Sequence, residues 1–547
     1  MKKQFQAVAV IGAALLVAAC EGDDGANGLD GAPGADGTNT AVRVRDLPVG
    51  DADCIGGGVA FDSGLDSNGD GILNDDEVTN TDFIDCAATP QLRALHASPD
   101  APLVNILVDG AAALEDVDFN TGSGLLPVGQ GDNVTADGVV VSVQVEAITP
   151  DGANPIAIDA DLELSFCTET TIIATNTVAN GLPLDAIVIE NPAGVPVTTG
   201  FARVQIAHAA PSAPPVDVFV TEPGADLAGS APVATALTFS TDTDLSVTPQ
   251  VEVPADTYQV RITPTGDTDT VVYDVEVELT DGADLLIAAT DNVFLGDSAV
   301  QLVILDGMMS TFLPDASTPA AAVAVHLSPD APAVDILADV DSTADDEALK
   351  LAENIAFTEF CVIDGIPAPE ADTAYTISVV ANADNTVVAT TFPFIANKNE
   401  AATAIVSGFL TTGTPEITAI PLATNVRSVA TEAQIRLTHG SPSTPNVDIY
   451  LLAAGTPFDP ANTEADFGDV PFGADTGVLR IDASVNYDVY ITAAGGEAAA
   501  IEVLGFDPEA GAVLDIIARD PATDGSEGTN PLPLIVSYDD TLADCTT

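Results

Sequence analysis

One phrase recurs four times along this chain and contains every histidine in it. The copies read HASPDAPLVNI, HAAPSAPPVDV, HLSPDAPAVDI and HGSPSTPNVDI, and they begin at His96, His208, His326 and His439. The histidines lie 112, 118 and 113 residues apart. Because this period is the size of one ordinary domain, we expect four tandem domains of about 110 residues, each with its own core.

The residues around each histidine alternate as in a half-buried strand. The positions four and two residues before it are apolar in all four copies, so the histidine should lie on the core-facing side of a strand. A Pro-x-x-Pro turn ends that strand, because proline fixes φ and has no N–H to donate. A second strand follows, in which a valine precedes Asp217, Asp335 and Asp448, or Asn105 in the first copy.

Short β-branched runs recur through the rest of each repeat. Tyr258, Tyr375 and Tyr487 lie 50, 49 and 48 residues after their histidine, and each opens another such run. Helical periodicity is confined to short stretches such as residues 345–356. Short strands at this spacing, separated by Gly, Pro, Asp and Asn, predict an all-β protein with four tandem immunoglobulin-like β-sandwich domains.

The repeated phrase resembles a known family. His-x-x-Pro-x-x-Pro-x-Val-Asp, followed by a strand that opens on tyrosine, is similar to the bacterial repeat called domain of unknown function 4397, over roughly residues 89–547. The resemblance implies an exported or surface protein and no assigned catalytic residue. The first repeat departs from the pattern most, since it has Asn105 and lacks the tyrosine.

The histidine could be reactive or structural. A serine lies two residues after it in three copies, as Ser98, Ser328 and Ser441, but the second copy has Ala210 there. The strand aspartates face the other way, and a metal site would have only one histidine per domain. We therefore predict no enzyme. The ring should instead donate an N–H to a carbonyl of the proline-rich turn.

The N-terminus predicts export and a lipid anchor. Residues 1–19 join two lysines to an apolar segment too short to span a bilayer, and they end in Val-Ala-Ala before Cys20. This resembles a bacterial lipoprotein signal with Cys20 lipidated, the alternative being an ordinary secretory signal. Glu21 after Cys20 resembles the sorting signal for the outer membrane. Whether the protein lies on the periplasmic or the outer side of that membrane stays open.

Two further segments precede the repeats. Residues 20–40 carry glycine at every third position, a collagen-like tract that would form either a trimer or, as we favour, a flexible spacer. Residues 41–88 contain Cys54 and Cys86, which we expect to pair in an oxidising compartment. The pairing of the other three cysteines stays open. The repeats then cover residues 89–199, 200–318, 319–430 and 431–547.

A twelve-residue stretch in residues 41–88 matches the EF-hand calcium loop. In DSNGDGILNDDE, calcium ligands are expected from six positions, which are Asp66, Asn68, Asp70, the carbonyl of Ile72, Asn74 through a water, and Glu77. The residues before the loop suggest a strand or turn, and only those after Asp75 suggest a short helix. The pattern predicts a single calcium loop; the alternative is an acidic turn without an ion.

The net charge of the chain limits the classes of molecule that it can bind. The chain has 84 acidic and 13 basic residues, a formal net charge of −71. Such a chain repels nucleic acid and anionic lipid, so apart from the membrane reached through its lipid we expect only an unknown surface or matrix ligand. The acidity suits either a salty habitat or ion binding. We expect a binding or adhesive stalk; the alternatives are an envelope scaffold and, remotely, an enzyme that uses the histidines.

Overall fold

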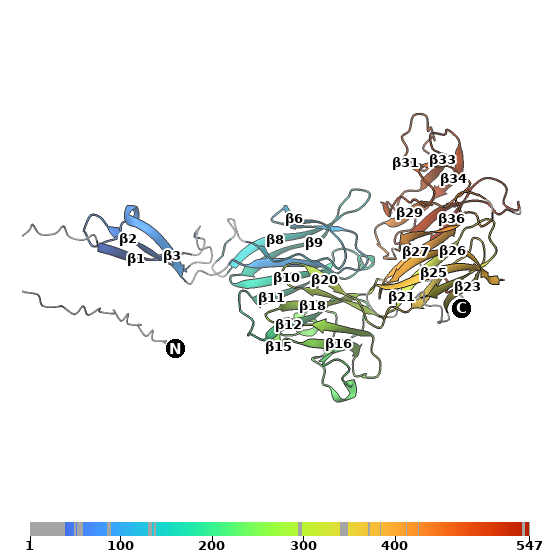
Figure 1. Ribbon diagram of the computed structural model, residues 1–547. Helices are drawn as coiled ribbons and strands as arrows, with labels where there is room; N and C mark the ends of the chain where they lie inside the picture. The colour runs from blue at the N-terminus through green and yellow to red at the C-terminus, as the bar shows by residue number, and fades with distance from the viewer. Residues whose placement is uncertain are drawn as a thin grey trace, which may run out of the picture. The chain divides into compact units, whose positions relative to one another are not determined.

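The computed structural model describes residues 39–48, 51, 58–84, 89–128, 134–135, 138–293, 298–339, 348–369, 372–382, 384–411, 413–424, 426–523, 525–538 and 542–545. They form two compact units. The first is a small sheet before residue 85, and the second holds the four repeats (Figure 1). The predicted signal, Cys20, the glycine tract, Cys54 and Cys86 lie outside the described residues.

The small unit is one sheet in the order β1-β2-β3, in which β2 and β3 pair antiparallel. Its elements are β1 (Asn39–Leu47), β2 (Gly58–Asp66), the 3-10 helix η1 (Asp75–Glu77) and β3 (Val78–Ile84). The loop of residues 66–77 therefore leaves a strand and enters one helical turn. Asp62 on β2 is buried, and both Arg43 and Arg45 donate to it at 2.6 and 2.7 Å.

Each repeat is a sandwich of two sheets with one shared topology, as the sequence predicts. Counting strands within a repeat, the first sheet has the order 4-1-7-8 and the second has the order 3-2-5-6. Strands 1 and 7 pair in parallel, as in β12 with β18, and the other pairs are antiparallel. Repeat 2 adds a ninth strand to its first sheet.

The strands of repeats 1 and 2 follow in chain order. Repeat 1 has β4 (Gln91–His96), β5 (Val104–Val108), β6 (Ala111–Val117), β7 (Leu126–Pro127), β8 (Gly138–Ala147), β9 (Ile156–Ser165), β10 (Thr168–Thr175) and β11 (Asp185–Pro192). Repeat 2 has β12 (Phe201–His208), β13 (Val216–Thr221), β14 (Ala234–Leu237), β15 (Val251–Pro254), β16 (Thr257–Pro264), β17 (Tyr273–Glu278), β18 (Asp284–Asp291), β19 (Val300–Leu305) and β20 (Ser310–Leu313).

In the part of the chain that the structure describes, repeats 3 and 4 have eight strands each. Repeat 3 has β21 (Ala320–His326), β22 (Val334–Asp339), β23 (Leu349–Ile355), β24 (Phe360–Ile366), β25 (Thr373–Ala381), β26 (Asp384–Ala396), β27 (Ala401–Ser407) and β28 (Thr418–Ala423). Repeat 4 has β29 (Ala433–His439), β30 (Val447–Ala453), β31 (Phe467–Val470), β32 (Leu479–Ile481), β33 (Tyr487–Ala493), β34 (Ala499–Phe506), β35 (Val513–Arg519) and β36 (Leu532–Ser537).

Helix is a minor element of the described chain. It comprises α1 (Thr243–Ser246) and the 3-10 turns η2 (Val178–Asn180) and η3 (Leu227–Gly229), besides η1. The helical periodicity within residues 345–356 predicts the wrong structure for residues 349–355, which form the edge strand β23. Pairing of β23 with β22 completes a sheet, and this long-range gain overrides the local pattern.

The first sheets are buried on both faces, because repeats pack in pairs. One face covers the core of its own repeat. The other face joins an apolar cluster shared by repeats 1 and 2, which includes Leu95, Ile173, Leu286 and Leu305. A second shared cluster joins repeats 3 and 4. For this reason almost every residue of β12, the first strand of repeat 2, is buried.

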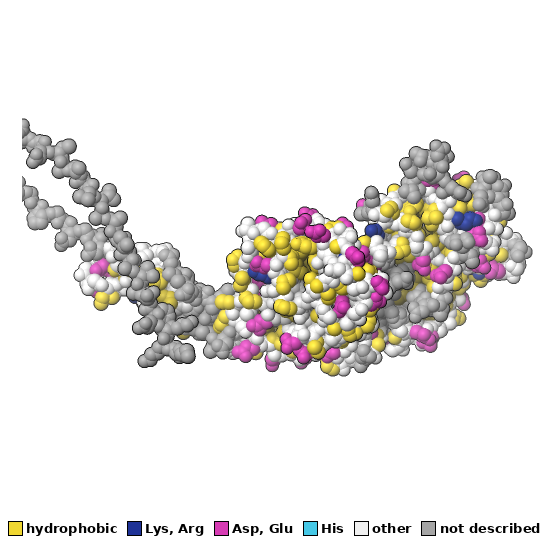
Figure 2. Space-filling model, turned by 90° about the horizontal axis from the view of Figure 1, so that it is seen from below, with side chains coloured by type: hydrophobic (Ala, Val, Ile, Leu, Met, Phe, Trp, Pro, Cys, Tyr) yellow, Lys and Arg dark blue, Asp and Glu magenta, His cyan; other side chains and the backbone are white. Residues whose placement is uncertain are grey.

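Acidic residues are scattered over the surface of these sandwiches that Figure 2 shows. Figure 2 shows Asp and Glu side chains scattered over one face, interspersed with apolar side chains and few Lys or Arg.

Candidate functional site

The four histidines are buried at the ends of strands β4, β12, β21 and β29, each at most 1% exposed. In every repeat Nε2 lies near the carbonyl oxygen six residues later, at the end of the proline-rich turn. The distances are 3.0 Å for His96 to Pro102, 3.4 Å for His208 to Pro214, 3.1 Å for His326 to Pro332 and 3.0 Å for His439 to Pro445. The imidazole thus spans the turn from one sheet to the other.

Burial keeps these rings neutral. Burial, together with the positive charge of Arg427, lowers the pKa of His96 to about 4. Burial also lowers the pKa of His208, His326 and His439. A neutral ring has one N–H to donate and one nitrogen that accepts. In repeat 1 the second nitrogen, Nδ1, accepts from the backbone N–H of Ser98 at 3.3 Å.

The strand aspartates bind backbone N–H groups of the neighbouring edge strand. Asp217 accepts from Ala236 at 2.8 Å, Asp335 from Asn354 at 2.9 Å, and Asp448 from Asp469 at 2.7 Å. Those three donor residues have φ of 52°, 56° and 57°, in the left-handed region. A non-glycine residue is disfavoured there, so the carboxylate stabilises a bulge in the edge strand. Sequence reasoning gave the aspartates no such role.

The serines after the histidines donate elsewhere. The hydroxyl of Ser98 donates to the carbonyl of Asn176 and that of Ser328 to the carbonyl of Gly408, both at 2.7 Å. The hydroxyl of Ser441 donates to Asp520. Each serine is two residues from its histidine in the sequence, but its hydroxyl group donates to an acceptor other than the imidazole.

The loop of residues 66–77 wraps around two buried carboxylates. One Asp66 oxygen accepts the N–H of Gly69 at 2.7 Å, and the other accepts that of Gly71 at 2.9 Å. Glu77 accepts from Ser67 at 2.9 Å and from Asn74 at 3.0 Å. The hydrogen bonds from Asn74 and Ser67 lower the pKa of Glu77 to about 2.

The remaining loop positions are more exposed. The Asn68 side chain accepts from the N–H of Asp70 at 2.8 Å, and Asp70 accepts from that of Ile72 at 2.7 Å. Gly71 has φ of 80°, which the tight turn requires. Within the described part of the chain, no three His, Cys, Asp or Glu side chains converge in a way that could hold a metal ion. The six predicted ligands thus share one loop without forming a preformed shell.

The described cysteines include one disulfide whose pairing the sequence leaves open. Cys361 of repeat 3 is bonded to Cys545 near the C-terminus, and Cys167 is free and exposed. Because Cys545 follows the last strand of repeat 4, this bond ties the two repeats together.

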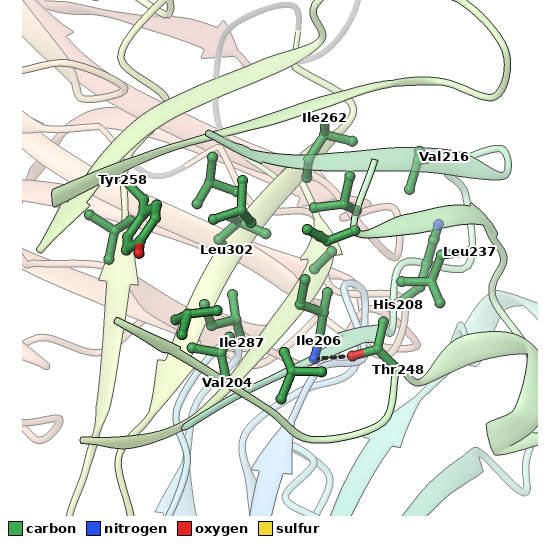
Figure 3. Close-up of a pocket in the computed structure, with 18 of the residues that line it drawn as sticks. Val204, Ile206, His208, Val216, Leu237, Thr248, Tyr258, Ile262, Ile287 and Leu302 are labelled. Carbon is green, nitrogen blue, oxygen red and sulfur yellow. Dashed lines mark hydrogen bonds between the residues drawn. The ribbon is translucent and has the colours of Figure 1, made fainter. Parts of the chain in front are cut away.

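A cavity that sequence reasoning missed lies between the two sheets of repeat 2. Its volume is about 360 Å³ and its lining is almost wholly apolar. Figure 3 shows Tyr258 toward one end, His208 and Leu237 toward the other, and Val204, Ile206, Ile262 and Leu302 between them. Alignment of the four repeats in the sequence could have revealed the small side chains that leave this cavity.

No helix in the described ranges has the length and apolar character needed to cross a membrane.

Comparison with known families supports the repeat assignment. Residues 90–219 and 323–450 match the family described as domain of unknown function (DUF4397). The resemblance expected from the sequence is confirmed. Each match contains two of the four histidine phrases. Residues 39–86 match a second family, described as domain of unknown function (DUF7151). The chain is thus a multi-domain protein of tandem all-β repeats.

Other comparisons add little. No curated protein matches the chain. Among solved structures, it is similar to the product complex of a multi-modular glycogen-degrading pneumococcal virulence factor, SpuA. The identity is 10%, the match covers 55% of this chain and 37% of that one, and the TM-score is 0.13. The match therefore spans well under half of that protein, and it carries no argument about this one.

Proposed function

We propose that this chain is an exported lipoprotein that presents its β-sandwich repeats as a non-catalytic binding or adhesive stalk on the bacterial cell envelope. The observation that carries the proposal is the use of the repeated polar residues. In each repeat the histidine bonds the turn that joins the two sheets. A bulge in an edge strand is bonded by the strand aspartate in repeats 2 to 4 and by Asn105 in repeat 1. Residues that recur in every copy are thus engaged in building the domain.

The paired packing of repeats supports a stalk. A shared apolar cluster between neighbouring sandwiches resists bending, since any hinge motion would expose apolar area at about 25 cal/mol per Å². Beyond the clusters, the hydroxyl of Thr175 donates to the carbonyl of Ala209 in repeat 2 at 2.8 Å, and that of Ser407 donates to Gly440 in repeat 4 at 2.7 Å. Rigid pairs hold the surfaces of two neighbouring repeats in a fixed arrangement.

Attachment of cells to immobilised glycans and matrix proteins tests the binding role. Cells that lack the chain should attach less to at least one of these surfaces, and the full chain should restore attachment. The scaffold alternative predicts unchanged attachment and an envelope more permeable to detergent. The enzyme alternative predicts turnover that substitution of the histidines abolishes in chains that still fold.

The anchor is tested separately. Cys20→Ser should move the protein from the membrane fraction to the soluble fraction, because acyl chains are then missing and none of the described helices offers a span. Labelled palmitate that still enters the Cys20→Ser chain contradicts the lipid assignment. Protease treatment of intact cells then assigns the repeats to the outer or periplasmic side.

We also propose that the loop of residues 66–77 binds one calcium ion. Its donors are all oxygens, which is the ligand type calcium takes. Asp66 and Glu77 are only 7% and 6% exposed. Asp66 accepts three backbone N–H groups, which leaves one of its lone pairs for an ion. Glu77 accepts hydrogen bonds from Ser67, Asn68 and Asn74, and calcium would replace some of these donors. A bound ion would join these two carboxylates to Asp70 and so stiffen the segment between anchor and repeats.

Calorimetry on the full chain tests the calcium proposal. We expect one site with an affinity on the order of 10⁻⁴ to 10⁻³ M, as in extracellular modules. Glu77→Gln should weaken it at least tenfold. Asp76→Asn removes the same kind of charge from an exposed position outside the ligand set and should leave it unchanged. Equal binding heats in both variants would mean that calcium only condenses on an acidic surface.

A further inference from the structure

The cavity in repeat 2 exists because two positions of its lining, Val277 and Val251, carry smaller side chains than the matched positions of other repeats. On β17, Val277 lies opposite Tyr258 of β16. The equivalent pairs elsewhere place Leu162 opposite Val141, Phe394 opposite Tyr375, and Phe506 opposite Tyr487. Val277 lines the cavity, so the missing ring leaves part of its volume empty.

Repeat 3 shows the effect of the larger side chains. A cavity lies at the matching place there, lined by Phe392 and Phe394 among others, and its volume is about 230 Å³. The corresponding cavity of repeat 2 is 360 Å³. The same sandwich topology therefore encloses more space where Val277 takes the place of Phe394.

The edge strand β15 follows the same trend. Val251 lies opposite Val204 in repeat 2, whereas Leu126 lies opposite Leu92 in repeat 1 and Leu479 opposite Ile435 in repeat 4. Val251 is 49% exposed and Val233, near β14, is 51% exposed, although both line the cavity. The cavity therefore reaches the surface between the two edge strands.

An insertion borders this opening. Thr248 bonds Ile206 through both its N–H and its hydroxyl, as Thr476 bonds Leu437 in repeat 4. From Phe239 to Thr248 is nine positions (248 − 239), but from Phe472 to Thr476 is four (476 − 472). The five additional residues accommodate α1, which is absent from the described part of repeat 4. Repeat 2 is thus altered at both its lining and its rim.

The lining indicates what kind of molecule fits. Its few polar groups are engaged within the protein. The hydroxyl of Tyr258 donates to Pro254 at 2.9 Å, that of Thr248 accepts from Ile206 at 2.9 Å, and His208 lies 3.4 Å from the carbonyl of Pro214. Burial raises the pKa of Tyr258, and the negative charges of Asp256 and Glu222 contribute to the same shift. Among the described residues that line the cavity none is a Lys or Arg, and an anionic head would meet carboxylates.

We propose that repeat 2 binds an uncharged, almost wholly hydrocarbon small molecule in this cavity. Ligand pockets commonly enclose about 300 to 1,000 Å³, and dry apolar cavities accept apolar guests. Transfer of the guest from water supplies the free energy of binding, since the lining offers few directed bonds. The site goes beyond the display role proposed above and does not depend on the anchor or on calcium.

Displacement of N-phenylnaphthylamine, an uncharged fluorescent probe, tests the proposal on the full chain carrying Cys20→Ser. This change removes the proposed lipid so that its own acyl chains cannot compete. Decanol should displace the probe, and decanoate should do so at least tenfold more weakly. Decanoate that binds as tightly as decanol overturns the uncharged ligand class.

Val277→Phe locates the site. It introduces the side chain that repeats 3 and 4 already carry there, so the fold has room for it. We expect decanol to bind at least tenfold more weakly. Val271→Phe makes the same change at a position that is 39% exposed and outside the lining, and it should bind like the parent. If Val277→Phe fails to fold, Val251→Leu replaces it, since repeats 1 and 4 carry leucine at that position. Unchanged affinity in a folded lining variant overturns the proposal.

Discussion

Replacement of His96 should destabilise repeat 1 by an amount that its contacts define. The ring is 1% exposed, lies 3.0 Å from the carbonyl of Pro102, and accepts from Ser98 at 3.3 Å. It also packs edge-on against Phe119, with centroids 6.3 Å apart. His96→Ala removes the ring and leaves a buried carbonyl and a buried N–H without this partner.

The expected magnitude follows from these losses. Each buried backbone group left unsatisfied costs about 1 to 3 kcal/mol. His96→Phe keeps most of the ring volume and loses both hydrogen bonds, so it should cost about 2 to 6 kcal/mol. His96→Ala loses the same bonds and also leaves a void, so it should cost more than His96→Phe. The same changes at His208 should cost less, because its Nε2 lies 3.4 Å from the carbonyl.

The pH dependence gives a second readout. The pKa of His96 is about 4 in the folded chain, against an ordinary value of about 6.5, so between these values the unfolded state holds the extra proton. The stabilisation is therefore complete above about pH 6.5 and declines as pH falls toward 4, by about 1.4 kcal/mol per pH unit. His96→Phe should remove this contribution from the slope.

Hydrogen exchange of peptides from β4 and β5 at neutral pH gives the local free energy of opening, and urea unfolding at pH 5 and 7 gives the slope. Val188→Ala, at an exposed site on β11, should change stability by less than about 0.5 kcal/mol. A His96→Phe chain with unchanged opening free energy and an unchanged slope would refute the structural role of the ring.

Two further perturbations test how repeats 3 and 4 are joined. Cys545→Ser opens a covalent loop of 184 residues and should destabilise them by roughly 5 kcal/mol in the chain-entropy model, while Cys167→Ser at an exposed free thiol should have no effect on unfolding. Ile517→Ala should cost about 2 to 5 kcal/mol, and because Ile517 packs against Val323 and Ile405 it should speed hydrogen exchange in both repeats. Faster exchange in repeat 4 alone would contradict a shared interface.

The sequence by itself determined the number of repeats, the all-β class and the inward direction of the histidines. A domain-sized period counts the units, and alternation of apolar residues along a strand shows which side chains share a face. Both signals are local. The burial of His326 at 1% exposure agrees with this reasoning.

The tertiary structure decided what covers the other face. Arg93 and Arg436, three residues before their histidines, suggest a solvent-exposed face, yet they are 6% and 5% exposed because a neighbouring repeat packs there. Arg436 is held by a 2.6 Å ion pair to the equally buried Asp515. A two-residue period distinguishes the two faces of a strand but carries no information on what packs against each one.

Strand β23 and the cavity of repeat 2 have the same origin. Residues 349–355 are a strand because β22 offers an unpaired edge, which no window of neighbouring residues records. Val277 leaves a space only because β16 sets it opposite Tyr258 and no other side chain fills the gap. Packing between segments distant in the chain decides such features, and one sequence without its fold does not specify those partners.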